Sequence, residues 1–439
     1  IFDALFLQQI KWISVFLLGN SNRTISAVQI KIEDVKHMIA ITGMAAISAA
    51  DTTENQLGKH ALSYDDQLEA WVGKLPSALK AEIEAIRAEN RNYQALDASV
   101  LYAMYVSRLA TQQAGWQQGS DFGINIGSSR GATQLFEQYF EHFLQNNKSE
   151  PLASPTTTLG NLSSWVAQDL QNNGPDISHS ITCSTALHAM LNGVAWLQAG
   201  MCDKFLVGGS EAALTPFTIA QMKVIKTYSR ALADAQFPCL ALDLDKTENT
   251  MVLGEGAAAV CLEKGKNENA LAYITGVGYA TEKLKHAVSI SAEAQCFQKS
   301  MRMAIEDAFG TGQDDEISVF AEMKNDDQIL TFAEMSKQVD AVVMHAPGTI
   351  AGDKTEYLAI KKIFGERLPL LTTNKWKIGH TFGASGLLSF DTAMHMVQHG
   401  EYEEVPFISV QKPPQQIKNI LVNAVGFGGN AVSILVSKA

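Results

Sequence analysis

Short β-rich runs alternate with amphipathic helical stretches from Met38 to the end of this chain. This alternation is typical of α/β proteins, in which helices cover the faces of a sheet. Neither a low-complexity tract nor a proline-rich linker divides the pattern. We therefore expect an α/β fold with a large core. The expected strands include residues 122–126, 204–207, 257–262, 341–344 and 420–423, and the expected helices include 134–144, 185–198 and 356–364.

The composition excludes several classes of protein. A net charge of −12 argues against a general nucleic-acid binder, because phosphate contacts need an excess of Lys and Arg. The five cysteines are odd in number and lack metal-type CxxC spacing, which indicates reduced thiols in a cytoplasmic protein. No run of about 18 apolar residues occurs, so we expect no membrane span.

The first 37 residues differ from the rest of the chain. Their apolar stretch, Ile1 to Leu18, is interrupted by polar residues and lacks the flanks of a signal peptide. We interpret residues 1–37 as an extension outside the main fold. Beyond it, residues 41–45 (Ile-Thr-Gly-Met-Ala) are echoed by residues 274–278 (Ile-Thr-Gly-Val-Gly). The echo predicts two similar halves that meet near the charged turn at residues 263–269.

Cys183 lies between a strand-like segment, Asp176 to Thr182, and a predicted helix over residues 185–198. A thiol at a helix N-terminus faces the positive end of the helix dipole and free backbone N–H groups, which favours the thiolate. Cysteine is also among the most buried residue types, and a single cysteine often only fills a core. The residue by itself leaves both roles open.

Two histidines occupy segments with unusual surroundings. His345 ends an apolar strand and enters a turn, after which a helix is expected at Asp353 with Glu356 in capping-box spacing. His380 lies among small residues, which indicates close approach of backbones around the imidazole. The segment Gly127-Ser128-Ser129-Arg130-Gly131 lacks the Gly-Lys-Ser/Thr ending of a P-loop, so we predict a tight turn there.

Taken together, these segments resemble the elongating β-ketoacyl-[acyl-carrier-protein] synthases of the thiolase superfamily. The resemblance extends over residues 38–439, and its motifs occur in the family's order. The matching stretches are Gly174-Pro175, Thr182-Cys183-Ser184, Gly208 to Ala212, Leu253 to Ala257, His345 with Gly348-Thr349 and Gly352-Asp353, Lys375 with Gly379-His380 and Gly383 to Gly386, and Gly426 to Gly429.

The resemblance implies a thiolase-like five-layer α/β/α/β/α sandwich of two similar halves. Residues 38–264 would carry the nucleophile, and residues 270–439 would carry the two histidines. The implied reaction is the decarboxylative Claisen condensation of an acyl thioester with malonyl-acyl-carrier-protein, which gives a β-ketoacyl-acyl-carrier-protein. The implied setting is fatty-acid, polyketide or aryl-polyene-type biosynthesis.

Site residues follow from the same resemblance. Cys183 matches the nucleophile that takes the acyl chain as a thioester. His345 and His380 match the pair that promotes malonyl decarboxylation and stabilises the enolate, and Lys375 matches their supporting lysine. Phe427 matches the gate of the acyl pocket, and its backbone N–H would form the oxyanion hole with that of Cys183.

The sequence departs from the family pattern at three places. Ala346-Pro347 stands where the family usually has Gly-Thr, and Ser389 stands where a glutamate normally supports the lysine. The stretch from Cys239 to Glu248 lacks the usual Arg-Pro-Phe-Asp and a later Arg. These departures favour a specialised polyketide or aryl-polyene-type system over housekeeping fatty-acid synthesis.

The family also implies partners. An acyl carrier protein would bring phosphopantetheine, so no metal or organic cofactor is expected. A homodimer, or a heterodimer with a related ketosynthase subunit, is expected as well. Arg87 and Arg91, on a charged helical stretch, are candidate contacts for an acidic carrier protein.

Three alternatives are weighed against this interpretation. A thiolase needs a second active-site cysteine near the C-terminus, and no cysteine follows Cys296. Initiating condensing enzymes pair Cys and His with Asn, whereas His380 occupies the third position here. A non-catalytic, chain-length-determining partner subunit lacks the nucleophile, whereas Cys183 is present.

Overall fold

The computed structural model describes residues 38–51, 59–159, 161–283, 291–310, 330–408 and 416–439. The predicted extension, residues 1–37, lies outside the described residues. In the described part, the strands form one large mixed sheet in the order β11-β10-β12-β13-β9-β1-β8-β6-β4-β5. Its strands are β1 (Ile39–Ile47), β4 (Gly123–Gly127), β5 (Asp176–Ile177), β6 (Lys204–Glu211), β8 (Gly256–Lys264), β9 (Ala272–Thr281), β10 (Ala341–Val343), β11 (Leu370–Thr372), β12 (Asn419–Gly426) and β13 (Asn430–Lys438). A small second sheet holds β2 (Ser63–Asp65), β3 (Ala70–Gly73) and β7 (Leu253–Gly254).

The large sheet contains the same arrangement twice. The order β1-β8-β6-β4-β5 has antiparallel pairs at its first two junctions and parallel pairs at the next two. The order β9-β13-β12-β10-β11 repeats these directions. The two units join where Ile39–Ile41 of β1 pairs with the start of β9. The expectation of two similar halves is confirmed; the proposed boundaries at residues 264 and 270 stay a prediction.

The sequence echo marks equivalent contacts in the two units. β1 packs against α2 (Ala98–Gln113), and β9 packs against α8 (Gln295–Phe309). A Cβ on Gly43 would lie 2.2 Å from the carbonyl oxygen of Ala110, and one on Gly276 would lie 2.1 Å from that of Ala304. Both strands therefore need glycine where a helix backbone crosses them closely.

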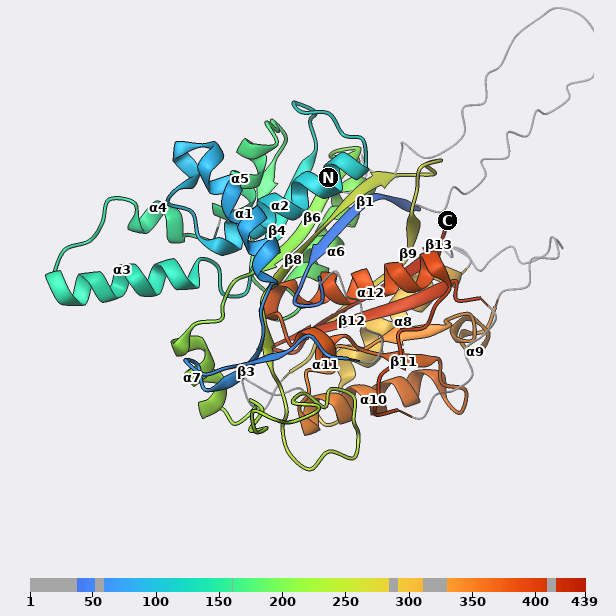
Figure 1. Ribbon diagram of the computed structural model, residues 1–439. Helices are drawn as coiled ribbons and strands as arrows, with labels where there is room; N and C mark the ends of the chain where they lie inside the picture. Colours follow the sequence, from blue (N-terminus) through green and yellow to red (C-terminus); the bar gives the residue numbers. More distant parts are fainter. Residues whose placement is uncertain (1–37, 52–58, 160, 284–290, 311–329, 409–415) are drawn as a thin grey trace, which may run out of the picture. The chain divides into compact units, whose positions relative to one another are not determined.

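Helices form three layers around the two sheet units (Figure 1). α6 (Thr185–Gln198) and α12 (Ser385–His399) form the central layer between the units and contact each other. The outer layers hold α1 (Ser77–Glu89), α2 and α5 (Asn161–Asp169) on one side, and α8 and α10 (Ile350–Phe364) on the other. This is the predicted five-layer sandwich. Its largest core cluster combines α6 and α12 with strands of both units, which makes the halves one hydrophobic body.

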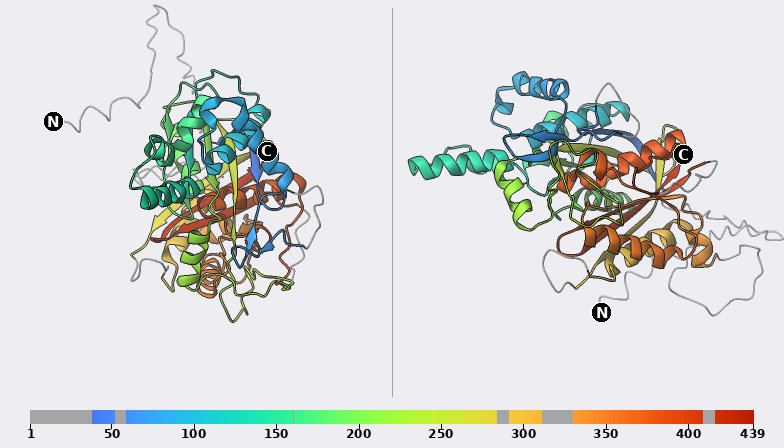
Figure 2. Two further views of the ribbon diagram at one scale, coloured as in Figure 1. Left: turned by 60° about the vertical axis from the view of Figure 1, so that its left-hand side comes forward. Right: turned by 60° about the horizontal axis from the view of Figure 1, so that its bottom comes forward.

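The remaining helical elements lie outside these layers. They are α3 (Thr133–Asn146), α4 (Ala153–Thr157), α7 (Pro216–Val224), α9 (Phe332–Ser336), α11 (Lys375–Ile378), and the 3₁₀ turns η1 (Arg91–Tyr93) and η2 (Phe382–Ala384). Both views in which α3 is seen side-on show it projecting from the layers (Figures 1 and 2). α3 exposes four large apolar side chains: Phe136, Phe140, Phe143 and Leu144.

Two local predictions need correction. The strand-like segment 176–182 is a strand only at Asp176–Ile177, because residues 178–180 have no regular secondary structure and Ile181 forms only an isolated bridge with Cys183. The helix expected to start at Asp353 begins at Ile350, with the side chain of Thr349 accepting the N–H of Gly352. Asp353 and Glu356 therefore do not cap this helix; their carboxylates accept backbone N–H groups of other segments.

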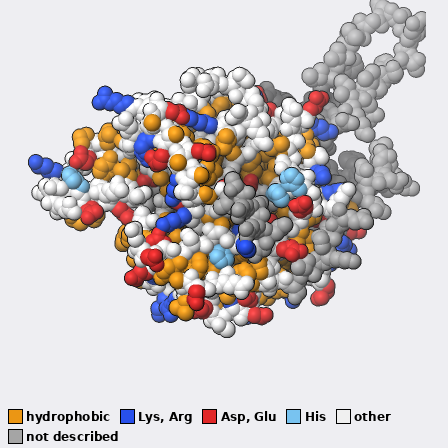
Figure 3. Space-filling view, viewed as in Figure 1, with side chains coloured by type: hydrophobic (Ala, Val, Ile, Leu, Met, Phe, Trp, Pro, Cys, Tyr) orange, Lys and Arg blue, Asp and Glu red, His pale blue; other side chains and the backbone are white. Residues whose placement is uncertain are grey.

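Two expectations drawn from the composition, on surface charge and on membrane-spanning helices, can be compared with the structure. Acidic, basic and apolar side chains are interspersed over the face seen in Figure 3. Among the described residues, no helix combines the length and apolar character that crossing a bilayer requires.

Candidate active site

A cavity of about 230 Å³ brings together four of the five residues singled out by the sequence: Cys183, His345, His380 and Phe427. Cys183 comes from the first sheet unit and the other three from the second. Residues 162 positions apart therefore meet because the central helices α6 and α12 pack against each other. Lys375, the fifth, does not line the cavity but lies buried behind it.

The backbone enters the left-handed region close to Cys183, His345 and His380. Thr182, directly before Cys183, has φ 46°, although β-branched residues rarely enter the left-handed region. Ala346, directly after His345, has φ 27°, and Phe382, two residues after His380, has φ 42°. Non-glycine residues in this region concentrate at functional sites, where the surrounding structure holds them.

Burial dominates the ionisation of Cys183. The side chain precedes α6 but is only 7% exposed. Burial raises the pKa of the Cys183 thiol to about 12, and the negative charge of Glu211 adds to the increase; Lys375 and the residue's own backbone N–H oppose it. The expected stabilisation of a thiolate by the helix terminus is thus outweighed in the unliganded pocket, because a buried anion loses its hydration.

Glu356 holds the backbone around His345. Its two carboxylate oxygens accept the N–H groups of His345 (3.0 Å) and Ala346 (2.9 Å). The amide of Asn423 donates a further hydrogen bond over 3.1 Å. The sequence indicated Glu356 only as a helix cap. The helical spacing could have indicated that Glu356 is buried, since it lies four residues before the apolar Ile360 and therefore on the same, inward face of α10.

The orientation of His380 is fixed by a backbone hydrogen bond. The N–H of Phe382 donates to Nδ1 of His380 over 3.0 Å, so Nε2 of the neutral ring carries the proton. The rings of His345 and His380 meet edge to face, with centroids 5.4 Å apart. Burial, and then the positive charge of Lys375, lowers the pKa of His380 to about 3. Burial also lowers the pKa of His345, followed by the effects of His380 and Lys375.

Lys375 is held by neutral groups. Its Nζ donates to Oγ of Ser389 over 2.7 Å and to Oδ1 of Asn374 over 3.0 Å. Burial lowers the pKa of Lys375 to about 8, while the negative charge of Glu356 opposes the decrease. Asp391 is exposed on the other side of α12, as its helical spacing from Ser389 predicts.

Phe427 stands at the cavity with 40% of its surface exposed. The residue before it, Gly426, packs directly on the residues that precede Cys183. A Cβ on Gly426 would lie 2.2 Å from Oγ1 of Thr182 and 2.6 Å from the carbonyl oxygen of Ile181. This close approach requires glycine at 426 and sets the residue before Phe427 directly against the residues that flank Cys183.

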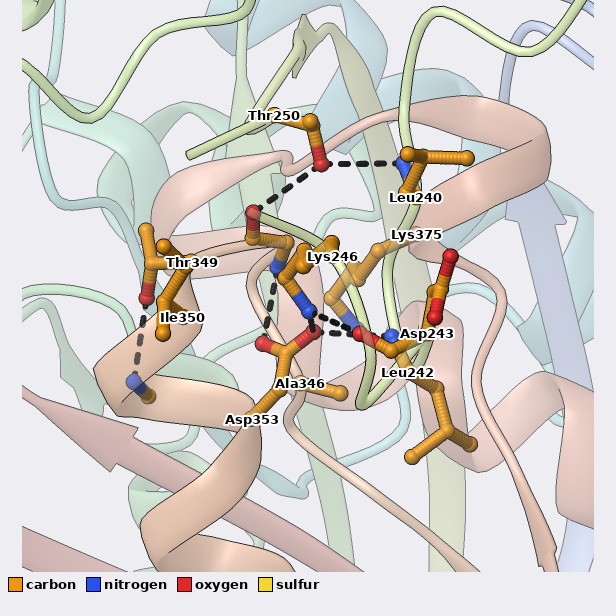
Figure 4. Close-up of polar contacts among 12 residues, drawn as sticks. Leu240, Leu242, Asp243, Lys246, Thr250, Ala346, Thr349, Ile350, Asp353 and Lys375 are labelled. Carbon is orange, nitrogen blue, oxygen red and sulfur yellow. Dashed lines mark hydrogen bonds and ion pairs between the residues drawn. The ribbon is translucent and has the colours of Figure 1, made fainter. Parts of the chain in front are cut away.

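The unusual stretch 239–248 is tied to α10, the helix that follows the His345 loop, by a buried ion pair (Figure 4). Lys246 Nζ and Asp353 Oδ2 are 2.7 Å apart, and both side chains are almost fully buried. Asp353 also accepts the N–H groups of Leu242 (2.8 Å) and Gly348 (3.0 Å). Breaking such a pair leaves a buried charge without compensation. The pair was not identified from the sequence, because its partners are 107 residues apart.

Arg87 is held by contacts within the chain, and its docking role stays a prediction. Its guanidinium pairs with Glu84 and donates to the carbonyl oxygens of Tyr93, Gln94 and Leu96. The lining of the cavity includes no residue of α1. Neither Arg87 on α1 nor Arg91 on η1 lines the cavity.

Comparison with known proteins supports the arrangement. A 3-oxoacyl-[acyl-carrier-protein] synthase 2 of Coxiella burnetii is 24% identical over 442 residues, which cover 92% of this chain and 99% of the relative. A solved β-ketoacyl synthase from Burkholderia phymatum has a TM-score of 0.74 at 19% identity and covers 92% of this chain and 100% of its own. A solved complex of a type II polyketide-synthase acyl-carrier protein with its ketosynthase has a TM-score of 0.72 at 18% identity, with the same coverage.

Two family models match most of the chain. The model described as "Beta-ketoacyl synthase, N-terminal domain" matches residues 36–268, and the corresponding C-terminal domain matches residues 315–406. The motifs, the duplicated fold and these matches agree, and the chain belongs to the β-ketoacyl synthase family.

Proposed function

We propose that the cavity catalyses condensation in two steps, with Cys183 as the nucleophile. In the first step, the Cys183 sulfur attacks an acyl-carrier-protein thioester, and the thiol proton leaves with the carrier's sulfur. In the second, malonyl-carrier-protein loses carbon dioxide, and the resulting enolate attacks the acyl-Cys183 thioester. A proton returns to Cys183, and the product is a β-ketoacyl-carrier-protein. The observation that carries the proposal is the shared cavity of Cys183 and two neutral histidines.

Neutral imidazoles suit the second step. Decarboxylation places negative charge on the thioester oxygen, and a fixed N–H donor stabilises that charge. His380 offers Nε2–H because its Nδ1 is occupied by the N–H of Phe382. Lys375 adds positive charge behind the rings, and Glu356 fixes the loop that carries His345. The backbone N–H groups of Cys183 and Phe427 would receive the oxygen of the acyl thioester.

An acyl carrier protein is the proposed partner, and phosphopantetheine would enter as part of this substrate. A solved relative forms such a complex. Around the cavity, Lys226 precedes the lining residue Thr227, and its carbonyl accepts a hydrogen bond from the lining residue Asn249. Lys354 lies beside lining Thr355 on α10, and both lysines are exposed. These cations replace Arg87 and Arg91 as our proposed contacts for an acidic carrier.

The docking proposal is tested by charge reversal. Lys226→Glu with Lys354→Glu should raise the KM for malonyl-carrier-protein, most strongly at low salt, because rim charges act on association. A short pantetheine thioester should show an unchanged KM. The matched control is Arg91→Glu on η1. An unchanged carrier KM in the double variant, or an equal increase in the control, would contradict the location.

We propose that a second subunit binds at α3 and at the open edge of the large sheet. Exposed Phe136, Phe140 and Leu144 on α3 form an apolar surface that isolated monomers rarely show. β5 ends the large sheet with an open edge in the described chain. Light scattering should report a dimer for the wild type and a monomer for Phe136→Glu with Phe140→Glu. A dimer that survives both changes would exclude α3 from the interface.

We propose a cytoplasmic location and no metal or organic cofactor. All five cysteines are free, in agreement with a reducing compartment. The groups needed for both steps are side chains and backbone N–H groups of the chain. The decisive test of function is the reaction itself: acyl transfer to Cys183, followed by release of carbon dioxide and product from malonyl-carrier-protein. Undiminished product formation by Cys183→Ala would refute the proposal.

A further inference from the structure

Glu211 is a buried carboxyl group to which the proposed reaction assigns no role. It ends β6, and no part of it is exposed to solvent. Its Oε1 accepts the N–H of Gly383 over 3.1 Å and that of Arg130 over 3.3 Å, as well as the N–H of Ser129. One oxygen thus gathers backbone donors from two separate segments.

The first segment is the Gly-Ser-Ser-Arg-Gly turn noted in the sequence. The chain bends at Ser129 and Arg130, and the N–H of Gly131 donates to Oγ of Ser128 over 2.8 Å. Two successive N–H groups of this turn, those of Ser129 and Arg130, point at Glu211. The turn therefore surrounds an anion, although that anion belongs to the protein and is not a bound phosphate.

The second segment follows His380. Gly383 lies so close to the first turn that a Cβ on it would be 2.5 Å from the nitrogen of Ser129 and 2.7 Å from Oε1 of Glu211. The adjacent residue, Phe382, is the donor that fixes Nδ1 of His380. A continuous set of contacts thus runs from Glu211 through Gly383 and Phe382 to the imidazole.

Glu211 also acts on Cys183 through its charge. After burial, it is the largest cause of the raised pKa of Cys183. Lys375 acts in the opposite direction on the same thiol. The guanidinium of Arg130 is directed at neutral partners, Thr218 and Gln221, and forms no ion pair with Glu211. The carboxylate therefore has no cationic partner of its own in the described chain, and its field reaches the nucleophile.

We propose that Glu211 is a positioning residue of the condensation reaction, which ties the turn at Ser129 to the segment at Gly383 and so orients His380. The charge of Glu211 on Cys183 is a second effect, which the same variants test. The role in orienting His380 rests on the proposed function, whereas the effect on the Cys183 thiol does not. Burial raises the pKa of Glu211 to about 7, while hydrogen bonds from Ser129 and Gly383 oppose the increase. The restraint on Cys183 is accordingly strongest above neutral pH.

Two variants separate the two effects. Glu211→Gln retains an acceptor oxygen for the turn but removes the charge, whereas Glu211→Ala removes both. The matched control is Asp97→Asn, because Asp97 is also a buried carboxylate that accepts backbone N–H groups, those of Ser99 and Leu135. Asp97 is not among the groups that change the pKa of Cys183 or of His380.

Two readouts are needed. The first is the rate of iodoacetamide alkylation at Cys183, followed by peptide mass spectrometry from pH 6 to 10. The second is carbon dioxide release from malonyl-carrier-protein, analysed as kcat and KM. Glu211→Gln should alkylate about threefold to tenfold faster at a given pH and retain decarboxylation within about threefold. Glu211→Ala should lose at least about tenfold in kcat with little change in KM. Asp97→Asn should match the wild type in both.

The outcomes distinguish this inference from the proposed function. An alkylation profile of Glu211→Gln that superimposes on the wild type would overturn the role of the charge, even if Glu211→Ala fails to fold. Unchanged kcat in folded Glu211→Ala would overturn the role in positioning. Wild-type protein that releases no carbon dioxide, yet shows the expected alkylation shift, would refute the proposed function and leave the effect on Cys183 standing.

Discussion

The ammonium group of Lys375 donates a hydrogen bond to the hydroxyl of Ser389 across 2.7 Å, with both side chains almost fully buried. A hydroxyl stabilises the ammonium less than a carboxylate would, because it carries no charge. Asp391, two residues further along α12, faces solvent and cannot take this place. The lysine therefore depends on Ser389, Asn374 and the nearby charge of Glu356.

We expect Lys375→Ala to be severely impaired in condensation and Asp391→Ala to be nearly neutral. The positive charge of Lys375 acts on both histidines, whereas Asp391 is not among the groups that affect the pKa of either one. Steady-state condensation rates, with circular dichroism to verify folding, measure both. Equal damage from the two changes would show that the alignment at Ser389 and the helix register are wrong.

The burial of Lys375 should make stability depend on pH in a defined direction. Its pKa is about 8 in the folded protein and 10.5 in the reference state. Between these values the unfolded chain binds more protons, so this residue's contribution to the free energy of unfolding rises with pH. Lys375→Met should therefore be more stable than the wild type below pH 8, and the difference should shrink towards pH 10.5. Urea unfolding at pH 7 and pH 10 tests this; a difference that grows with pH would contradict it.

Cys183→Ala should abolish acyl labelling and condensation while the fold is retained. Cys183 is the nucleophile in the proposed reaction, and the smaller side chain fits a site beside an existing cavity. Intact-mass measurement after incubation with acyl-carrier-protein reports the adduct. An adduct on another cysteine, with Cys183 unmodified, would show that the nucleophile has been misassigned.

His345→Ala and His380→Ala should each lose about 10²–10³ in the rate of malonyl decarboxylation. Each should still acylate Cys183, because the thiol proton leaves with the carrier's sulfur and both rings act on the later step. Carbon dioxide release and acyl labelling are measured on the same preparation. Normal carbon dioxide release from either variant would contradict the assigned role.

Gly426→Ala should impair acylation of Cys183 more than it impairs folding. The added methyl group would meet Oγ1 of Thr182 and the carbonyl oxygen of Ile181, so the backbone at Phe427 must move away from the nucleophile. Burst-phase acylation and urea unfolding provide the comparison. An unchanged burst in a folded variant would show that the N–H of Phe427 is not needed to receive the acyl oxygen.

The sequence by itself determined the fold class and pointed to four residues that line one cavity. Alternating strand and helix patterns depend on local spacing, and they located α6 at residues 185–198 and the strand before His345. The repeated Ile-Thr-Gly indicated duplication because β1 and β9 meet the same steric demand from a crossing helix. Each family motif is a short, unbroken stretch of sequence, so the resemblance could identify it without a structure. These motifs contain Cys183, His345, Lys375, His380 and Phe427.

Tertiary structure decided what depends on distant contacts. The pairing of Lys246 with Asp353, the support of His345 by Glu356, and the contacts of Glu211 join residues that are remote in sequence or hidden inside a helix pattern. Tertiary structure also decided the ionisation state of the Cys183 thiol. The helix terminus at Cys183 favours thiolate locally, but burial removes water from the sulfur and reverses the balance. Burial is a property of the whole packed molecule, and no local motif encodes it.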